Sequence, residues 1–311
     1  MKNNAILGKI ATMSAVLALG TLTGCGADKA ENTNEAQKVA DIEEATDVSE
    51  ETMAEENVTK EEVIIEQEID PAYKLVWEDN FEADRLNMDD WNYEYHEPGW
   101  VNNELQEYVD SEENIYLKDG ELVIQALKHE DENGNITYTS GRVNTQNKHD
   151  FKYGRFEARA KVPSGKGFLP AFWMMPTDEN LYGQWPKCGE IDIMEHLNSE
   201  DKAYQTVHSQ YTVKQYEPKT ENGSNSPIDR TVFNTYSVVI EQDAIVFYIN
   251  GKHTFTYKRE PFGDSQFPFA GHPFYVILSA QLGGSWVGEV NPDDLPVKME
   301  IDYVRFYLPK K

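Results

Sequence analysis

The sequence predicts an all-β domain, built from short strands as a sandwich or a barrel. Apolar and polar residues alternate over residues 156–162, which is the period of a strand with one buried face. Two similar runs, residues 244–249 and 253–257, flank Asn250-Gly251-Lys252, and an Asn-Gly pair is a strong hairpin signal. No long segment of the chain has a helical period. Together these observations favour one β domain over a helical or mixed fold.

The first segment, residues 1–25, is predicted to be a bacterial export signal. Lys2 and Lys9 precede an apolar run at residues 11–19, which is too short to span a membrane. Leu22-Thr23-Gly24-Cys25 follows the run and resembles a lipobox. Cys25 is therefore expected to become the lipidated N-terminus of an exported, membrane-anchored protein. An ordinary signal peptide with an incidental cysteine is the alternative.

The second segment, residues 26–70, is predicted to be a disordered acidic tether. It contains sixteen Asp or Glu against three Lys and has no aromatic residue. Such a segment cannot bury enough apolar surface to fold. The whole chain carries a net charge of −27 and has no basic stripe, which disfavours nucleic acid and sulfated polysaccharides as partners.

The third segment, residues 71–311, carries the strand pattern and is long enough for one domain. Alternation returns over residues 297–307 near its end. Residues 211–227 are rich in Lys, Glu, Asn and Ser and are expected to form a loop. Cys188 is the only cysteine besides Cys25, so a lipidated Cys25 leaves no partner for an intrachain disulfide.

Three carboxylates, Glu190, Asp192 and Glu195, lie within six residues and are separated by apolar side chains. On a strand, Glu190 and Asp192 share one face. Glu195 follows at an odd spacing, so a regular strand would turn it into the core, where a lone carboxylate is costly. One extra residue at Ile193-Met194, a β-bulge, returns Glu195 to the face of the other two. We therefore expect three acids in a row on one face of a sheet.

Such a row is the layout of a retaining glycosidase. Retaining glycoside hydrolysis uses an ionised carboxylate as nucleophile and a protonated carboxyl as acid, about 5–5.5 Å apart. The carboxyl groups of Glu190 and Glu195 can approach only on a concave strand, which predicts a curved sheet with a substrate cleft. A negative Asp192 between them raises the pKa of a neighbouring carboxyl. A surface strand that alternates Glu and Ile by chance is the alternative.

The segment from Gly189 to Glu195 resembles the signature of glycoside hydrolase family 16. Its bulged form is typical of laminarinase-like β-1,3-glucanases and of galactan-cleaving members. Other segments are similar to the family in the same order, namely Leu75–Phe81, Gly99–Gln106, Tyr153–Arg159, Pro170–Met174, Gly283–Trp286 and Asp302–Tyr307. The resemblance implies a β-jelly roll of two stacked, curved antiparallel sheets with a substrate cleft on the concave one.

The resemblance also implies roles for individual residues. Glu190 is the expected nucleophile, Glu195 the acid/base, and Asp192 the residue that orients Glu190, and the reaction requires no cofactor. Trp77 and Trp91 are expected in the core. Indole rings offer apolar plates to sugar faces. The side chains expected to bind substrate are Asn102, Arg142, Trp173, Trp185, His208 and Trp286, with His208 beside the acid/base.

A structural Ca²⁺ ion on the convex side is a further implication of the resemblance. The matching positions are Asn80, Gly120 and Asp302, although Asn80 stands where an acid is expected. Calcium takes several oxygen ligands, including backbone carbonyls. The ion would take no part in the reaction, and the protein is expected to be a monomer.

The expected substrate is β-1,3-glucan of the laminarin type, cleaved within the chain, with mixed-linkage β-1,3-1,4-glucan as a second substrate. Val101 and the segment Ser279–Gly284 depart from the laminarinase pattern where sugar subsites are built. An endo-β-galactosidase or O-glycanase of the same family is therefore one alternative. A surface glycan-binding protein without catalysis is an alternative of another class, and transglycosylation would use the same residues as hydrolysis.

Overall fold

The computed structural model of the protein describes residues 71–310. The predicted export signal with Cys25, and the predicted tether at residues 26–70, lie outside the described residues. Within them the fold is all-β, with seventeen strands, one short helix α1 (Gln210–Val213) and the 3₁₀ turns η1 (Gly263–Ser265) and η2 (Pro292–Asp294). No helix in this range is long and apolar enough to cross a membrane. The predicted fold class is confirmed.

One sheet has ten strands, and all its pairs are antiparallel except β3 with β6. Its strands are β1 (Tyr73–Asp79), β3 (Gln106–Tyr108), β4 (Ile115–Lys118), β5 (Glu121–Glu130), β6 (Ile136–Ser140), β8 (Gly154–Lys161), β13 (Asn234–Ile240), β14 (Ala244–Ile249), β15 (Lys252–Lys258) and β17 (Val297–Pro309). The strands follow the order β15-β14-β13-β8-β17-β5-β6-β3, while β1 pairs with β17 and β4 with β5.

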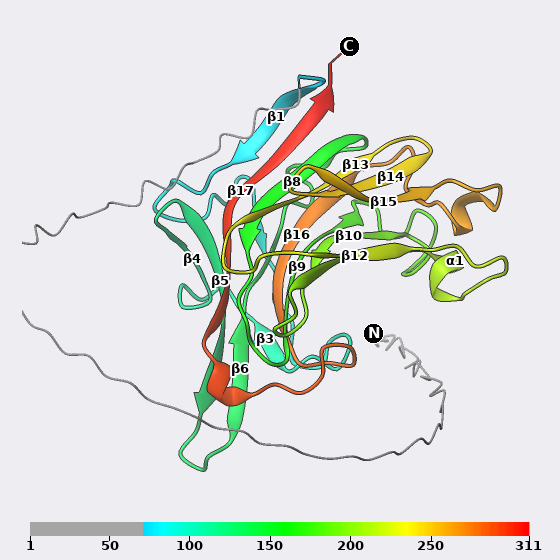
Figure 1. Ribbon diagram of the computed structural model, residues 1–311. Helices are drawn as coiled ribbons and strands as arrows, with labels where there is room; N and C mark the ends of the chain where they lie inside the picture. The colour runs from blue at the N-terminus through cyan, green and yellow to red at the C-terminus, as the bar shows by residue number, and fades with distance from the viewer. Residues whose placement is uncertain (1–70, 311) are drawn as a thin grey trace, which may run out of the picture. The chain divides into compact units, whose positions relative to one another are not determined.

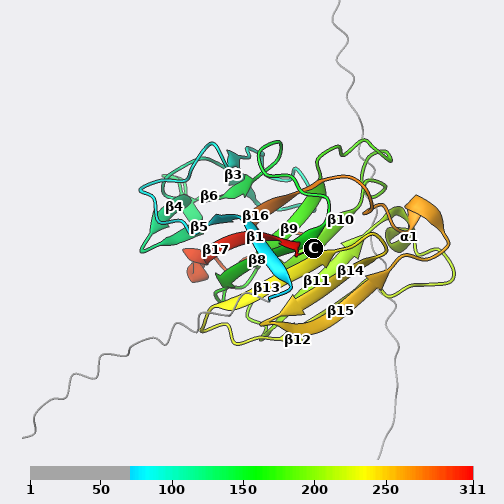
Figure 2. The ribbon, with the colours of Figure 1, turned by 90° about the horizontal axis from the view of Figure 1, so that it is seen from above.

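The other sheet has seven antiparallel strands and carries the acidic row. Its strands are β2 (Asn92–Tyr93), β7 (Arg142–Asn144), β9 (Phe168–Pro176), β10 (Glu190–Glu195), β11 (Lys202–His208), β12 (Gly223–Pro227) and β16 (Phe274–Leu282). The order is β12-β11-β10-β9-β16-β7-β2. The two sheets lie one above the other, and β16 and β17 bend along their length (Figures 1 and 2).

Local sequence signals explain the strands that were predicted. In β8 the side chains of Phe156, Ala158 and Ala160 are fully buried, as the alternation required. Asn250 and Gly251 both have positive φ, 50° and 71°, which is the backbone of a two-residue type I′ turn. That turn joins β14 to β15 in the predicted hairpin.

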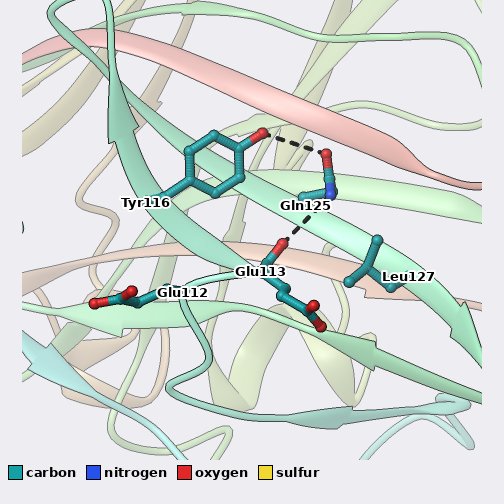
Figure 3. A pocket seen from close by; sticks show the side chains of 5 residues that line it. All are labelled: Glu112, Glu113, Tyr116, Gln125 and Leu127. Carbon is teal, nitrogen blue, oxygen red and sulfur yellow. Dashed lines mark hydrogen bonds between the residues drawn. The ribbon is translucent and has the colours of Figure 1, made fainter.

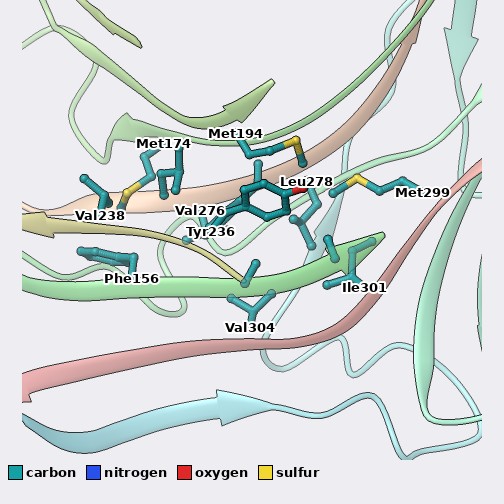
Figure 4. Packing of buried hydrophobic residues seen from close by; sticks show 14 of the residues in the cluster. Phe156, Met174, Met194, Tyr236, Val238, Val276, Leu278, Met299, Ile301 and Val304 are labelled. Carbon is teal, nitrogen blue, oxygen red and sulfur yellow. The ribbon is translucent and has the colours of Figure 1, made fainter. Parts of the chain in front are cut away.

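The core lies between the two sheets, where apolar side chains from both interdigitate (Figure 4). Phe156 and Val304 come from the ten-stranded sheet, and Met174 and Met194 from the seven-stranded one. Trp91 is fully buried in this core, as expected. Trp77 is partly buried against it.

The segment expected to be a loop, residues 211–227, differs from the prediction. It contains most of α1 and the whole of β12. The helix begins at Ser209, which forms a capping box with Thr212. β12 is an edge strand held by backbone pairing to β11, so it needs no apolar alternation to form.

Candidate active site

The acidic row lies on β10, and the predicted bulge is present. Asp192 pairs with Thr206 on β11, whereas Glu195, three positions later, pairs with Tyr204, two positions earlier. The register with β9 shifts at the same point. The extra residue turns Glu195 to the face of Asp192, while Ile193 and Met194 are fully buried in the core.

A hydrogen bond holds Glu190 in place. The indole Nε1 of Trp185 donates to its Oε2 at 2.5 Å. His208 lies opposite Glu190 on β11, and its Nε2 is 3.2 Å from Oδ2 of Asp192. His208 thus contacts Asp192, the middle acid of the row, and its charge also acts on Glu195, so its place beside the acid/base stays a prediction. The register places it at the Glu190 end of the row, because Glu195 pairs with Tyr204 instead.

The carboxyl groups of the row influence one another. Burial and the negative charge of Asp192 raise the pKa of Glu190 to about 8. The same two causes raise the pKa of Glu195 well above its usual range. Burial alone would lower the pKa of His208, but its hydrogen bond to Asp192 and the surrounding carboxylates raise it to about 10. The row therefore keeps a proton at neutral pH, opposite a cationic imidazole.

The two glutamates differ in what surrounds them. The indole of Trp185 donates to Glu190, and this hydrogen bond lowers the pKa of Glu190. Among the described residues, Glu195 has no such donor. Glu190 is thus the easier of the two to ionise, and Glu195 is the one that retains the proton.

A line of paired residues leads across the sheet from the acids. Glu195 pairs with Ala171 on β9, Ala171 with Ser279 on β16, and Ser279 with Arg142 on β7. Paired residues point to the same face of a sheet. Arg142 therefore shares the face of Glu195, three strands away.

Aromatic rings cover the guanidinium of Arg142. It lies 4.6 Å from the ring centre of Trp173 and 5.1 Å from that of Trp100. Its Nε is 2.7 Å from the Glu94 carboxylate. Burial raises the pKa of Glu94, but the charge of Arg142 and the hydrogen bonds from His96 and Asn144 together lower it. The rings, the cation and the acid form a preorganised polar surface with apolar plates.

Asn102 and Trp286 come together through a contact between two loops. The backbone carbonyl of Asn102 accepts from the backbone N–H of Ser285 at 2.9 Å. Trp286 follows and is half exposed, and its ring meets the edge of Tyr204 at 5.3 Å. Because Tyr204 pairs with Glu195, this contact places Trp286 at the Glu195 end of the row. Trp185 stands at the Glu190 end.

Two of the three positions expected to hold calcium have side chains that contact an arginine. The Asp302 carboxylate pairs with Arg159 at 2.6 Å, and the Asn80 amide oxygen accepts from Arg305 at 3.4 Å. Gly120 has a φ of 78° in the turn between β4 and β5. A calcium ion bound by these two side chains would compete with both arginines, and the ion stays a prediction.

A hollow of about 400 Å³ lies on the other sheet and not at the acids. Its walls come from β4, β5 and the segment before β4, and the Gln125 amide joins Tyr116 to the backbone of Glu113 there (Figure 3). Glu112 and Leu127 complete the lining. The hollow shares no residue with the acidic row.

Several residues of this face were not predicted. Trp100 stands inside one of the segments that resemble the family, so its position was a usable signal. The sequence carried no such signal for Glu94, His96 and Tyr204. The His96 ring stacks on Trp100 with ring centres 3.5 Å apart, and its Nε2 is 2.9 Å from Glu94. These contacts join residues far from the acidic row in sequence.

Comparison with known proteins gives a consistent result. Residues 100–305 match the sequence profile of Glycosyl hydrolases family 16. The chain is 36% identical over 265 residues to glucan endo-1,3-beta-glucosidase A1 of Niallia circulans, which covers 76% of this chain and 39% of that protein. It is 35% identical over 237 residues to keratan-sulfate endo-1,4-beta-galactosidase of Sphingobacterium multivorum, with 76% and 55% covered. The chain thus spans less than two thirds of either relative's length.

The fold is also similar to solved structures. The laminarinase from Rhodothermus marinus superposes with a TM-score of 0.70 at 32% identity, covering 77% of this chain and 98% of that one.

Proposed function

The chain belongs to glycosyl hydrolases family 16, and we propose that it is a retaining endo-β-1,3-glucanase. One observation carries the proposal. The bulge in β10 brings Glu190, Asp192 and Glu195 to one face of the seven-stranded sheet, with the Trp185 indole donating to Glu190. The same face carries the aromatic and polar groups that a glucan chain would contact.

The first step is a displacement at the anomeric carbon. The ionised carboxylate of Glu190 attacks this carbon, and the bond to the glycosidic oxygen breaks. Glu195 donates its proton to the leaving oxygen, which departs as a hydroxyl of the released chain. Trp185 and the cationic His208 stabilise the carboxylate form of Glu190 before the attack. The product is a glycosyl ester on Glu190.

The second step releases the ester. Glu195, now a carboxylate, takes a proton from water as the water oxygen attacks the anomeric carbon. The ester bond breaks, Glu190 leaves as a carboxylate, and Glu195 is protonated again. Two inversions give net retention. The charge of Asp192 helps return the proton to Glu195, because it raises the pKa of that carboxyl.

The substrate assignment rests on relatives. One relative is glucan endo-1,3-beta-glucosidase A1, and the fold is similar to that of a laminarinase. A non-specific endo-beta-1,3(4)-glucanase of family GH16 shares 34% identity with this chain and a TM-score of 0.69. Mixed-linkage β-1,3-1,4-glucan is accordingly proposed as a second substrate.

A second candidate is an endo-β-galactosidase with the same mechanism. The relative from Sphingobacterium multivorum supports it at nearly the same identity as the glucanase relative. The acidic row would be unchanged in such an enzyme. Only the surface that contacts the sugars would differ, and the family resemblance implies that the departures at Val101 and Ser279–Gly284 lie there.

A substrate panel tests the assignment. The protein is incubated with laminarin, mixed-linkage glucan and poly-N-acetyllactosamine, beside Glu190→Gln and a matched control, Glu289→Gln. The Glu289 side chain is 90% exposed. We expect oligosaccharides from laminarin with the wild type and with Glu289→Gln, and none with Glu190→Gln. Release from poly-N-acetyllactosamine alone would favour the galactosidase, and binding without release would favour a glycan-binding protein.

We also propose that the protein is exported and anchored through a lipid on Cys25, as the N-terminal sequence predicts. Cys25 lies outside the described residues, and the proposal rests on residues 1–25 alone. Growth with a labelled fatty acid should label the wild type and leave Cys25→Ala unlabelled. Label on both proteins, or on neither, would contradict the anchor.

The reaction as proposed takes its nucleophile and its acid from carboxyl groups of the chain. A structural calcium ion at Asn80, Gly120 and Asp302 is a separate proposal from the family resemblance. Calcium added to chelator-treated protein should raise the melting temperature if the ion binds there, and Asp302→Ala should abolish that rise. A melting temperature indifferent to calcium would contradict it.

A further inference from the structure

The side chain of Gln205 holds the bulge that positions Glu195. Ile193 is left out of the register with β9, where Asp192 pairs with Trp173 and Met194 with Phe172. It is also left out of the register with β11. Its carbonyl instead accepts a hydrogen bond at 2.9 Å from the side-chain amide of Gln205. A bulged residue loses its ladder partner, and here an amide supplies one.

Gln205 is the β11 residue that faces the bulge from inside the sandwich. It lies between Tyr204 and Thr206, which pair with Glu195 and Asp192, so its side chain points to the opposite face. It is fully buried. A buried amide is costly unless its hydrogen bonds are made, so a glutamine at this position needs specific partners.

The remaining partners of Gln205 come from the other sheet. Its Nε2 also donates to the backbone carbonyl of Tyr248 on β14 at 3.3 Å. Its Oε1 accepts from the hydroxyl of Thr254 on β15. The two carbonyls can only accept, so they fix the amide nitrogen on their side and leave Oε1 to accept from the Thr254 hydroxyl. The amide thus ties the bulge to two strands of the ten-stranded sheet.

We propose that Gln205 is a positioning residue for catalysis, which holds the Ile193 carbonyl and thereby sets the position of the Glu195 carboxyl. The proposal rests on the proposed function of Glu195 as acid/base. Gln205 touches no substrate from inside the sandwich and acts only through the backbone of β10. Its loss should impair proton donation and leave attack by Glu190 nearly unchanged.

The test separates proton donation from nucleophilic attack. A 2,4-dinitrophenyl leaving group departs without protonation, whereas the glycosidic oxygen of laminarin needs the proton. The measured quantity is kcat/KM for laminarin divided by kcat/KM for 2,4-dinitrophenyl β-laminaribioside, because kcat/KM reports the first displacement. A misplacement of about 1 Å costs about 100-fold in rate, so Gln205→Met should lower this ratio about 10- to 100-fold.

The matched control removes the side-chain amide of another buried glutamine. Gln266 is also fully buried, donates to the Lys258 carbonyl at 2.9 Å and accepts from the backbone N–H of Glu260 at 2.9 Å. Gln266→Met should lower the melting temperature and leave the ratio at the wild-type value. Thr254→Val removes the hydroxyl that donates to Oε1 of Gln205, and should lower the ratio by a smaller factor.

The outcomes separate this proposal from the proposed function. Glu195→Ala must lower the ratio strongly, and an unchanged ratio there would overturn both. A lowered ratio in Glu195→Ala with a wild-type ratio in Gln205→Met would overturn the positioning role alone. An equal fall in Gln266→Met would also overturn it, by showing a general effect of core damage. If Gln205→Met does not fold, the ratio of Thr254→Val decides in the same way.

Discussion

Replacing Trp185 by Phe should shift the acid limb of the pH–rate profile to higher pH. The indole donates to Oε2 of Glu190 at 2.5 Å, and a donor to a carboxylate lowers its pKa. Phe keeps an aromatic ring and removes the donor. The pKa of Glu190 must therefore rise, and a nucleophile that has to be ionised then becomes active only at higher pH.

The size of the shift follows from the geometry. A hydrogen bond to a charged group contributes about 1.5–3 kcal/mol to stability. Trp185 is 51% exposed, so water competes for the carboxylate and the lower end applies. About 1.4 kcal/mol corresponds to about one pKa unit. At pH values well below the acid limb, kcat/KM of Trp185→Phe should thus be about tenfold lower than that of the wild type. On the plateau of the profile it should change little.

The assay is kcat/KM on laminarin across the pH range, with Trp286→Phe as the control. Trp286 is equally exposed, at 51%, and its indole contacts Tyr204 instead of an acid. Its replacement should change KM without moving the limb. An acid limb that stays in place in Trp185→Phe, or that moves equally in Trp286→Phe, would refute the reasoning.

Three further predictions concern the acid and the scaffold. Glu195→Ala should lower kcat/KM on laminarin by about 10²- to 10⁴-fold, the contribution of general acid catalysis; a loss below tenfold would argue against this role. Phe172→Ala should reduce the free energy of unfolding in urea by about 3–5 kcal/mol, because the ring is fully buried, whereas Val232→Ala at an exposed position should be nearly neutral. Gly154→Ala should cost about 1–3 kcal/mol, since φ is 130° and a Cβ would meet the backbone of Tyr307; wild-type stability would contradict this.

The bulge and the hairpin could be predicted because their signals are local. Glu195 at an odd spacing from Glu190 would have been a lone buried carboxylate in a regular strand, so the energetic cost itself indicated the extra residue. Asn250-Gly251 indicated its turn through the backbone conformation that only such residues adopt readily. The resemblance to the family then gave the jelly roll, which strand periodicity alone could not distinguish from a barrel.

The support behind the acids could not be predicted. Gln205 lies in an alternating strand like any inward-facing residue, and its partner Thr254 belongs to the other sheet. Glu94 reaches Arg142 only because β2 pairs with β7. Each of these contacts depends on how separate strands pair or stack, and no local pattern in the sequence encodes that arrangement.

His208 is a residue whose contacts a resemblance in sequence does not determine. The segment around His208 resembles the family, but the contacts of the imidazole depend on the register between β10 and β11. The bulge separates Glu195 from the residues opposite Glu190, so His208 contacts Asp192. A shift of one residue in the register between β10 and β11 would turn His208 to the other face of the sheet.

The most direct test of the account is to identify the residue that becomes glycosylated. A 2-deoxy-2-fluoro laminaribioside with a dinitrophenyl leaving group forms the glycosyl ester quickly and releases it slowly, so the labelled peptide can be sequenced by mass spectrometry. The account predicts one label, on the carboxyl of Glu190, in the wild type and none in Glu190→Gln. A label on Asp192 or Glu195, or turnover without any covalent adduct and with inverted product, would contradict the central claim.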